Sequence, residues 1–454
     1  MSKRNRGAVA VDAVMPPTKQ RYVECMKNQF NYWRTQSIQK QVVRTFLREF
    51  KPTTAIARGQ QIVFDVPGTP HYYNDLSSSN VRLRARILQP TGVAITAAMH
   101  VGTANLYANS MFADVMVELG GQLLGVATNG LYPYRAYIET LIDTNEENKL
   151  TWGQTEGWYK DTPGQMAAAD PDPADANLGL HARERRFAVG SEVEMTLRPH
   201  VDVFQQELCM PSHVNMRLFL YPARDEFVLK AAAADVAFRL EITDATFVVE
   251  TCEVTAEMEG AQMALLYKGL NMHFPLKKME IRQFTITPNQ GLHTFEKAFT
   301  TTVPDRVLLM LVAQTSKDGH YMQNPFNFHH HNINHLQLVV GADSLQMRPL
   351  TPDYRAAAFY LESYNSLWRA ANKMYKNATV GISYSDFIQG YTIYGIDLSA
   401  DGSGGECPNA PRKGEVRIEV GFRENPVVAL TLLAIAEKPG WFEIDAHGDV
   451  IKPE

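Results

Sequence analysis

The segment Val81-Arg-Leu-Arg-Ala-Arg-Ile87 alternates apolar and charged side chains at every position. An alternation of period two predicts a β-strand with one buried face and one solvated face, as in antiparallel sheets. The segments Glu192-Val-Glu-Met-Thr-Leu197 and Glu415-Val-Arg-Ile-Glu-Val420 show the same pattern. The sequence therefore predicts antiparallel sheets that have one wet face.

Other segments are largely apolar, namely Val307 to Ala313, Leu336 to Val340 and Val427 to Ala436. These segments predict strands that are buried on both faces or that lie at contacts between subunits. Turn-rich stretches separate the strands, for example at 287–291 and 399–414. Many short strands joined by turns that contain Gly and Pro favour a β-sandwich or a barrel.

Three helices are expected among the strands. The first begins near Pro133, because proline suits the first helical position. The second follows Thr351, a candidate cap, and Pro352, and the third covers about 261–270. Apolar residues at helical spacing form one face of the first helix (Tyr134, Tyr137, Ile138, Leu141 and Ile142) and of the second (Tyr354, Ala357, Ala358 and Leu361, continuing to Trp368).

The order of these features repeats along the chain. Gly120 and Gly341 each follow an apolar strand and lie 221 residues apart, and Tyr134 and Tyr354 each open a Tyr-Arg-Ala helix start 220 residues apart. Further pairs at a similar offset are Val193 and Val416, Ile62–Val66 and Ile281–Ile286, and the strands at Val81 and Val307. The offset predicts two copies of one β-rich unit. The alternative is coincidence between common strand–turn–helix patterns.

The repeat predicts an all-β chain of two tandem eight-stranded jelly-roll sandwiches with a few short inserted helices. The expected organisation is an N-terminal arm at 1–45, a first jelly roll at 46–258, a linker helix at 259–275 and a second jelly roll at 276–454. A helix inserted in the middle of each unit fits a jelly roll better than an immunoglobulin sandwich. The segment 150–185 is expected to be a long irregular loop, functional or at an assembly surface.

Composition limits the classes of function. The chain has 454 residues, of which 45% are hydrophobic and 20% charged, which is typical of globular proteins. With 44 basic and 49 acidic residues it is not expected to neutralise nucleic acid, except at the tip that carries Lys3, Arg4 and Arg6. We expect no membrane span, because no apolar run reaches about 18 residues. The basic N-terminus is followed by no apolar region, so synthesis inside the cell without a secretory signal is expected.

Candidate sites for metal ions are weak. His329, His330, His331 and His335 form the best cluster, but neighbouring side chains of a strand point to opposite faces and do not converge on one ion. The acidic run at 170–175 lacks the glycine and terminal glutamate of a calcium loop. Surface or interface histidines, with a pH-sensitive subunit contact as one option, are the favoured interpretation. The four cysteines, at positions 25, 209, 252 and 407, are scattered and predict neither a zinc knuckle nor a disulfide framework.

No motif of an enzyme is found. The glycine-rich stretch at 402–405 is not followed by Lys-Ser/Thr, so it is not a phosphate-binding loop. The sequence has no G-x-S-x-G elbow and no H-E-x-x-H helix. We therefore expect no catalytic residue, no cofactor and no metal. The Asn377-Ala-Thr sequon is interpreted as a chance match.

Several stretches resemble the major capsid protein of Polinton/Maverick elements and adintoviruses. They are Tyr132-Pro-Tyr-Arg-Ala-Tyr-Ile-Glu-Thr-Leu141, Trp158-Tyr-Lys-Asp-Thr-Pro-Gly-Gln-Met166, Pro199-His-Val-Asp-Val-Phe-Gln-Gln-Glu207, Asn324-Pro-Phe-Asn-Phe328, Arg348-Pro-Leu-Thr-Pro-Asp353, Gly390-Tyr391 and Asp397-Leu398. The resemblance spans roughly residues 50–450. It departs from the family pattern at 143–149 and at 399–413, which are expected to be exposed loops.

The resemblance implies a double jelly roll whose three copies form a homotrimer of near-hexagonal outline. Such capsomers tile an icosahedral shell, so the implied partners are further copies of the chain, penton proteins and minor capsid proteins, and the implied location is the virion. Two alternatives belong to other classes. One is a β-sandwich module that binds a glycan or receptor, and the other is a metal-dependent β-sandwich enzyme that uses His329 or His331.

Overall fold

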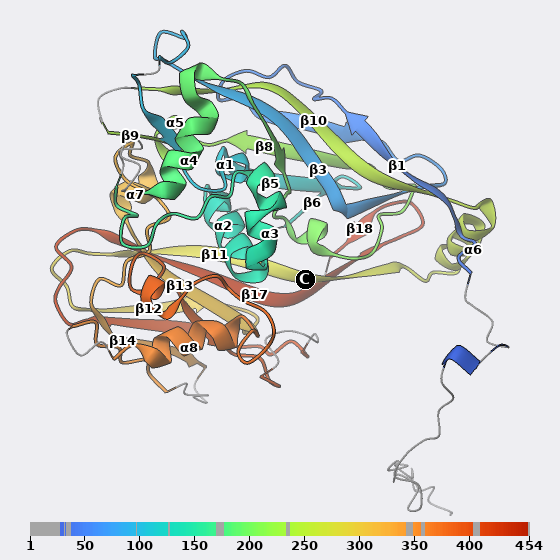
Figure 1. The fold of residues 1–454 in the computed structure, drawn as a ribbon. Helices are drawn as coiled ribbons and strands as arrows, with labels where there is room; N and C mark the ends of the chain where they lie inside the picture. The colour runs from blue at the N-terminus through green and yellow to red at the C-terminus, as the bar shows by residue number, and fades with distance from the viewer. Residues whose placement is uncertain are drawn as a thin grey trace, which may run out of the picture. The chain divides into compact units, whose positions relative to one another are not determined.

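The computed structural model describes residues 28–30, 32, 38–96, 98–125, 128–168, 177–232, 237–341, 348–355, 359–402 and 409–452. Residues from Val42 onward form one compact unit, and Met1–Gln41 form a separate unit that contains the short helix η1 (Asn28–Phe30). The larger unit is built from strands, and helices are inserted between them (Figure 1).

The first half of the larger unit is a sandwich of antiparallel sheets. One sheet has the order β1 (Val42–Phe50), β10 (Arg239–Val254), β3 (Tyr72–Leu88) and β7 (Val193–Leu197). The other has the order β2 (Ile62–Val66), β8 (Met216–Pro222), β5 (Phe112–Leu119) and β6 (Gln122–Leu124), and β4 (Val101–Thr103) pairs separately with β9 (Leu229–Ala231). The rings of Phe64 and Phe247 lie 5.8 Å apart and join the two larger sheets. We call this half the first roll.

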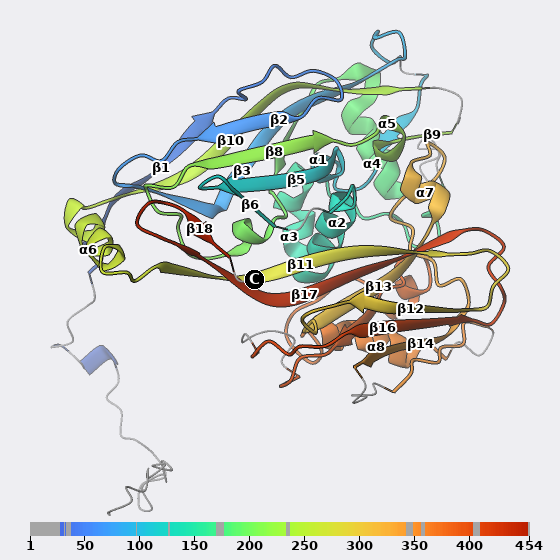
Figure 2. The ribbon, with the colours of Figure 1, turned by 180° about the vertical axis from the view of Figure 1, so that it is seen from behind.

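The second half is a smaller sandwich, which we call the second roll. Its upper sheet in Figure 2 has the order β11 (Met272–Ile286), β17 (Leu430–Ile444), β13 (Arg306–Ala313) and β15 (Tyr394–Asp397), and β18 (Val450–Ile451) extends β17. Its lower sheet has the order β12 (Leu292–Phe299), β16 (Val416–Phe422) and β14 (Ile333–Val340). Within the described ranges, each strand pairs only with strands of its own half.

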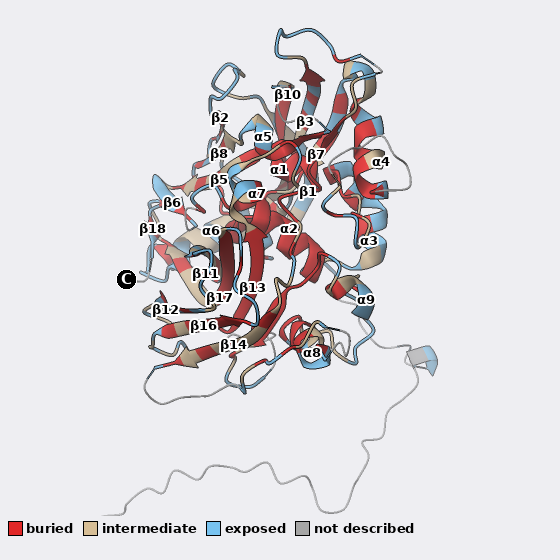
Figure 3. Ribbon diagram, turned by 90° about the vertical axis from the view of Figure 1, so that its left-hand side faces the viewer, coloured by how far each residue is buried: buried red, intermediate tan, exposed pale blue. Residues whose placement is uncertain are grey.

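The apolar run of β13 is buried on both faces because it separates two cores. Val307, Leu309 and Leu311 pack inside the second roll, against the apolar residues of β16. Leu308 and Met310 point the other way, into the large core that continues through the first roll. Figure 3 shows buried positions running through both rolls and through helix α2 (Tyr132–Asp143) between them. The prediction of strands buried on both faces is confirmed for β13 and for the first half of β17, but it is wrong for 336–340, which alternate, and for Val427 and Val428, which are exposed.

Helices occupy the connections between strands. They are α1 (Tyr107–Ser110), α2 (Tyr132–Asp143), α3 (Glu146–Leu150), η2 (Trp152–Glu156), α4 (Leu178–Phe187), η3 (Ala188–Gly190), η4 (Asp202–Gln205), α5 (Asp225–Val228), α6 (Ala256–Leu266), α7 (Gln314–Asp318), α8 (Leu361–Ala370) and α9 (Tyr384–Phe387). Among the residues that the structure describes, no helix is long and apolar enough to cross a membrane.

The three predicted helices meet different outcomes. The first is confirmed as α2, which has Pro133 in its first turn and is buried on nearly every side. The third lies a few residues earlier than expected, because the Thr255 side chain caps α6 by accepting a hydrogen bond from the Met258 amide.

The expected start of the second helix, with Thr351 as cap, is wrong, because α8 begins only at Leu361. The amide of Asp353 bonds to the carbonyl of Phe359, and the Tyr354 ring stacks on His330 at 4.1 Å, so the chain is held out of a helix. Residues 356–358 lie outside the described ranges. The two tyrosines that suggested the repeat, Tyr134 and Tyr354, therefore have different local structures.

The linker helix and the N-terminal arm both differ by a few residues from the expected boundaries. Helix α6 lies between the two rolls in the chain, as expected of a linker helix, but it begins three residues before 259–275, and the last residues of that range belong to β11. Strand β1 begins at Val42, so the last residues of the expected arm are already part of a sheet. The expected irregular loop 150–185 contains η2 and most of α4, which corrects that prediction.

Candidate functional site

The two rolls meet along a buried surface that we call the inter-roll joint. It consists of α2, the segment 158–166, the segment 324–328 and the segment 389–392. In Figure 1, α2 lies between the sheets of the first roll and the long strands β11 and β17 of the second. These four segments include most of the stretches that carry the sequence resemblance, although they are far apart in the chain.

Aromatic rings fill the centre of the joint. Tyr137 of α2 stacks on Phe326 with ring centroids 4.2 Å apart and planes at 4°, and on Trp158 at 5.3 Å. One helical turn earlier, Tyr134 makes an edge contact with Phe326 at 5.6 Å and a tilted contact with Phe328 at 6.4 Å. All five side chains are buried. Because these rings come from both rolls, their packing fixes one roll against the other.

A buried ion pair lies beside the rings. Arg183 of α4 donates from Nη2 to Oδ1 of Asp161 at 2.7 Å, and from Nε and Nη1 to the carbonyls of Thr103 and Tyr159, each at 2.7 Å. The second roll also binds Asp161, through Asn324 Nδ2 at 3.2 Å. Both charged groups are almost fully buried, so each depends on the other and on these hydrogen bonds.

A second buried ionic network starts at Arg135 of α2. Its guanidinium donates to Glu139 Oε1 at 2.8 Å and to Asp202 Oδ1 at 2.5 Å, and His200 Nδ1 lies 2.7 Å from Glu139 Oε2. Burial alone would raise the pKa of Glu139, but the charge of Arg135 and the hydrogen bond with His200 hold that pKa at about 2. Asp202 also accepts from the Met279 amide of β11 at 3.2 Å, which extends the network into the second roll.

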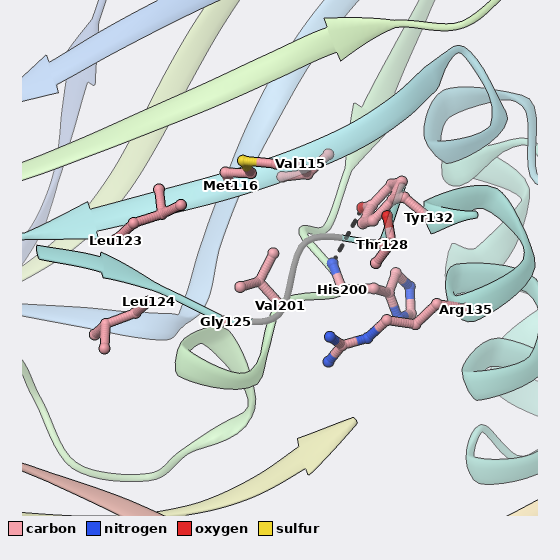
Figure 4. Close-up of a pocket in the computed structure, with 10 residues that line it drawn as sticks. All are labelled: Val115, Met116, Leu123, Leu124, Gly125, Thr128, Tyr132, Arg135, His200 and Val201. Atoms are coloured by element: carbon pink, nitrogen blue, oxygen red, sulfur yellow. Dashed lines mark hydrogen bonds between the residues drawn. The ribbon is translucent and has the colours of Figure 1, made fainter. Parts of the chain in front are cut away.

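The small cavity in Figure 4 lies next to this network. Its volume is about 10 Å³, and its lining includes Thr128, Tyr132, Arg135 and His200. The dashed line marks the His200 amide donating to the Tyr132 hydroxyl at 3.1 Å. A cavity of this size holds about one water molecule, so this polar cluster has no room for an organic substrate.

The expectation that 143–149 is an exposed loop is wrong at Lys149. The Lys149 side chain is fully buried, and its ammonium donates to the Leu141 carbonyl at 2.7 Å and to the Val380 carbonyl at 2.9 Å. It therefore satisfies the carboxyl end of α2 and ties it to the second roll. Burial lowers the pKa of Lys149 to about 8.

Arg183 and Lys149 were not predicted. The helical spacing of Leu180, Arg183 and Phe187 would have placed Arg183 on the buried face of α4, so the sequence carried a signal for it. Lys149 also pairs with Glu146 of its own helix at 3.3 Å, but its burial depends on the carbonyl of Val380, which is distant in the chain.

A buried carboxyl near His200 gives the first testable expectation. Glu156 is 3% exposed, and burial raises its pKa from 4.5 to about 7. The folded state then holds a proton that the unfolded state releases, so stability falls as pH rises from 4.5 to 7. We expect Glu156→Gln to remove this loss, so that its free energy of unfolding at pH 8 exceeds that of the parent protein by about 3 kcal/mol.

The measurement for Glu156 is the urea midpoint at pH 5 and pH 8. The matched control is Glu257→Gln, because Glu257 is exposed on α6. Equal pH dependence of the parent protein and Glu156→Gln would contradict the expectation.

The histidine cluster forms a tight turn and does not converge. His329 Nδ1 accepts from the His331 amide and His330 Nδ1 accepts from the Asn332 amide, both at 3.0 Å, so these ring nitrogens are engaged by the backbone. His335 lies apart, 3.9 Å from Glu419. Among the described residues, no group of three or more His, Cys, Asp or Glu side chains is placed to hold a metal ion. The acidic run at 170–175 and residues 403–405 of the glycine-rich stretch lie outside the described residues.

Acid should destabilise this turn, which is our second expectation. Burial and the neighbouring histidines lower the pKa of His330 from 6.5 to about 3, and burial and His329 lower the pKa of His331 to about 4. The unfolded state therefore binds protons that the folded state does not, and stability falls as pH drops below 6.5. We expect His330→Asn, whose amide oxygen can still accept from Asn332, to lose about 1 kcal/mol less than the parent between pH 7 and pH 5.

This expectation is checked by chemical unfolding at the two pH values. His447→Asn is the control, because His447 is exposed. An unchanged pH dependence in His330→Asn, or an equal change in the control, would show that the turn is not the acid-sensitive element.

The two cysteines within the described ranges, Cys209 and Cys252, are free thiols. Cys25 and Cys407 lie outside those ranges. Burial raises the pKa of Cys209 to about 12, which keeps the thiol protonated and unreactive near neutral pH.

Comparison with solved structures identifies the architecture. A chain of the Sputnik virophage cryo-EM structure has a TM-score of 0.64 and is 11% identical, with 96% of this chain and 93% of that chain covered. The PBCV-1 virus capsid model has a TM-score of 0.59 at 9% identity, covering 93% and 100%. The faustovirus major capsid protein has a TM-score of 0.56 at 8% identity, covering 93% and 92%. The chain has the double jelly-roll fold.

The predicted all-β class and the two tandem sandwiches are thereby confirmed. In sequence, the chain is 22% identical over 347 residues to an uncharacterized protein of Caenorhabditis elegans. The aligned region covers 75% of this chain and 79% of that protein. No protein-family model matches the chain. The similarity to these solved structures covers 93–96% of the chain.

Proposed function

We propose that the chain is a structural major capsid protein whose homotrimers tile an icosahedral shell. The observation that carries the proposal is the joint. Rings from both rolls are stacked there, and the buried ion pairs of the first roll accept hydrogen bonds from Asn324 and Met279 of the second, which holds the two sandwiches as one rigid body. Two similar rolls held rigidly together suit a trimer with a near-hexagonal outline. Three copies of the chain then place six similar sandwiches around a closed ring.

The similarity to capsid structures over almost the whole chain supports this proposal. We further propose the Polinton/adintovirus type, because the chain resembles that family in seven stretches, most of which line the joint. The relative in a nematode is compatible with an element carried in an animal genome. In this proposal the chain is no enzyme, it resides in the virion, and its partners are other copies of itself together with penton and minor capsid proteins.

The experiment is the native mass of the purified chain by light scattering, followed by negative-stain imaging. The expected result is a species of three times 51.0 kDa with a hexagonal outline. Large interfaces of the kind that obligate trimers bury should keep it intact at micromolar concentration. A stable 51.0 kDa monomer at that concentration would contradict the proposal.

A further inference from the structure

The first roll carries a groove of about 880 Å³ that plays no part in the joint. We call it the first-roll groove and define it by Ile56, Arg224, Arg239, Leu240 and Ile242, all of which line it. The volume is within the range of pockets that bind small molecules. Leu240 and Ile242 are only half-buried, although they pack against the main core, so an apolar floor remains open to solvent.

The wall of the groove is fixed by ion pairs. Arg58 Nη2 lies 2.6 Å from Asp225 Oδ2, and Asp225 Oδ1 accepts from the Leu240 amide at 3.1 Å. These bonds pin the loop before β2 to the start of β10. Arg86 is likewise engaged, with Nε 2.6 Å from Glu241 Oε2. The groove is therefore held open by its own polar contacts and needs no ligand to form.

Two guanidiniums remain available. Arg224 and Arg239 both line the groove, and neither guanidinium has a hydrogen-bond or carboxylate partner among the residues that the structure describes. Glu226 also lines the groove, and its carboxylate has no ion pair among the described residues. Two unpaired guanidiniums and one unpaired carboxylate therefore leave one net positive charge in the groove. A planar guanidinium with free N–H groups is suited to bind a carboxylate through two parallel hydrogen bonds.

We propose that the first-roll groove binds a single-chain aliphatic carboxylate, that is, a free fatty acid. Arg224 and Arg239 hold the carboxylate, and the hydrocarbon chain covers Ile56, Leu240 and Ile242. The combination of two unpaired guanidiniums with an apolar floor indicates this class of ligand. An inorganic anion would leave the apolar floor in water, and a neutral hydrocarbon would leave both guanidiniums unused. This site is independent of the proposed capsid role.

The test is calorimetric titration of the full chain with dodecanoate below its micelle concentration. We expect saturable binding of one dodecanoate per chain, at least tenfold weaker in Arg224→Gln/Arg239→Gln. Dodecanol, which has the same chain and no charge, should bind at least tenfold more weakly than dodecanoate. In a second variant, Ala223→Phe, the added ring should fill part of the groove and reduce dodecanoate binding, because Ala223 lines the groove and is only half-buried.

The control variant is Arg82→Gln, whose guanidinium pairs with Glu49 on the outer face of the sheet. It should bind dodecanoate like the parent. The proposal is overturned if dodecanoate does not saturate, or if the two arginine substitutions leave its affinity unchanged. It is also overturned if dodecanol binds as tightly as dodecanoate. Binding of an acidic peptide to the groove without binding of dodecanoate would overturn it as well, because the groove would then be a protein docking surface.

Discussion

Arg183→Met is expected to destabilise the chain by about 3–5 kcal/mol. The substitution removes the only cation that contacts the Asp161 carboxylate among the described residues, and both groups are almost fully buried. It also leaves the carbonyls of Thr103 and Tyr159 without their donor. The loss is therefore the cost of an unpaired buried charge together with two unsatisfied carbonyls, and it should appear as a large fall in the urea midpoint.

Two further variants separate this explanation from a general effect of removing arginine. Arg369→Met breaks an exposed pair with Glu362, whose side chains are 52% and 60% exposed, and should cost about 0.5 kcal/mol or less. Adding Asp161→Asn to Arg183→Met should recover part of the stability, because the buried negative charge is then gone. A change below about 1 kcal/mol in Arg183→Met would show that the pair is not needed.

The sequence predicted the sheets well because their signal is local. Alternation at Val81–Ile87 places four apolar side chains on one face, and the structure buries all four. The burial of residues 307–312 on both faces followed from their continuous apolar run. Helix α2 was found because Pro133 and the apolar spacing after it agree with each other.

Contacts between distant segments could not be predicted in this way. The helix expected to start near Tyr354 begins only at Leu361, because His330 and Tyr394 hold that tyrosine in a non-helical segment, and neither residue is near it in sequence. Lys149 looked like a solvated residue because lysine is rarely buried, and its backbone partners exist only in the folded chain. The joint was marked by unusual stretches of sequence, but periodicity gave no reason for these stretches to meet.

Tyr137→Ala should be as damaging as the loss of Arg183, for a different reason. The Tyr137 ring is fully buried between Trp158 and Phe326, and removing it leaves a cavity at the centre of the joint. Large-to-small substitution of a buried aromatic residue costs about 3–5 kcal/mol, because both burial and packing are lost. We expect a lower melting temperature and a weaker near-ultraviolet dichroism signal, since Trp158 loses its stacking partner.

Two tyrosine variants test whether the ring itself carries this effect. Tyr137→Phe keeps the stack and should change stability by less than about 1 kcal/mol. Tyr375→Ala removes a tyrosine that is 96% exposed and should be close to neutral. If Tyr137→Ala were as mild as Tyr375→Ala, the two rolls would be held together by their ionic contacts and the aromatic stack would be incidental. If Tyr137→Ala is severe and Tyr375→Ala is not, the rigid pairing of the rolls depends on hydrophobic packing. Any trimer of the chain should then also be weaker in Tyr137→Ala, because the two rolls would no longer be held in one fixed arrangement.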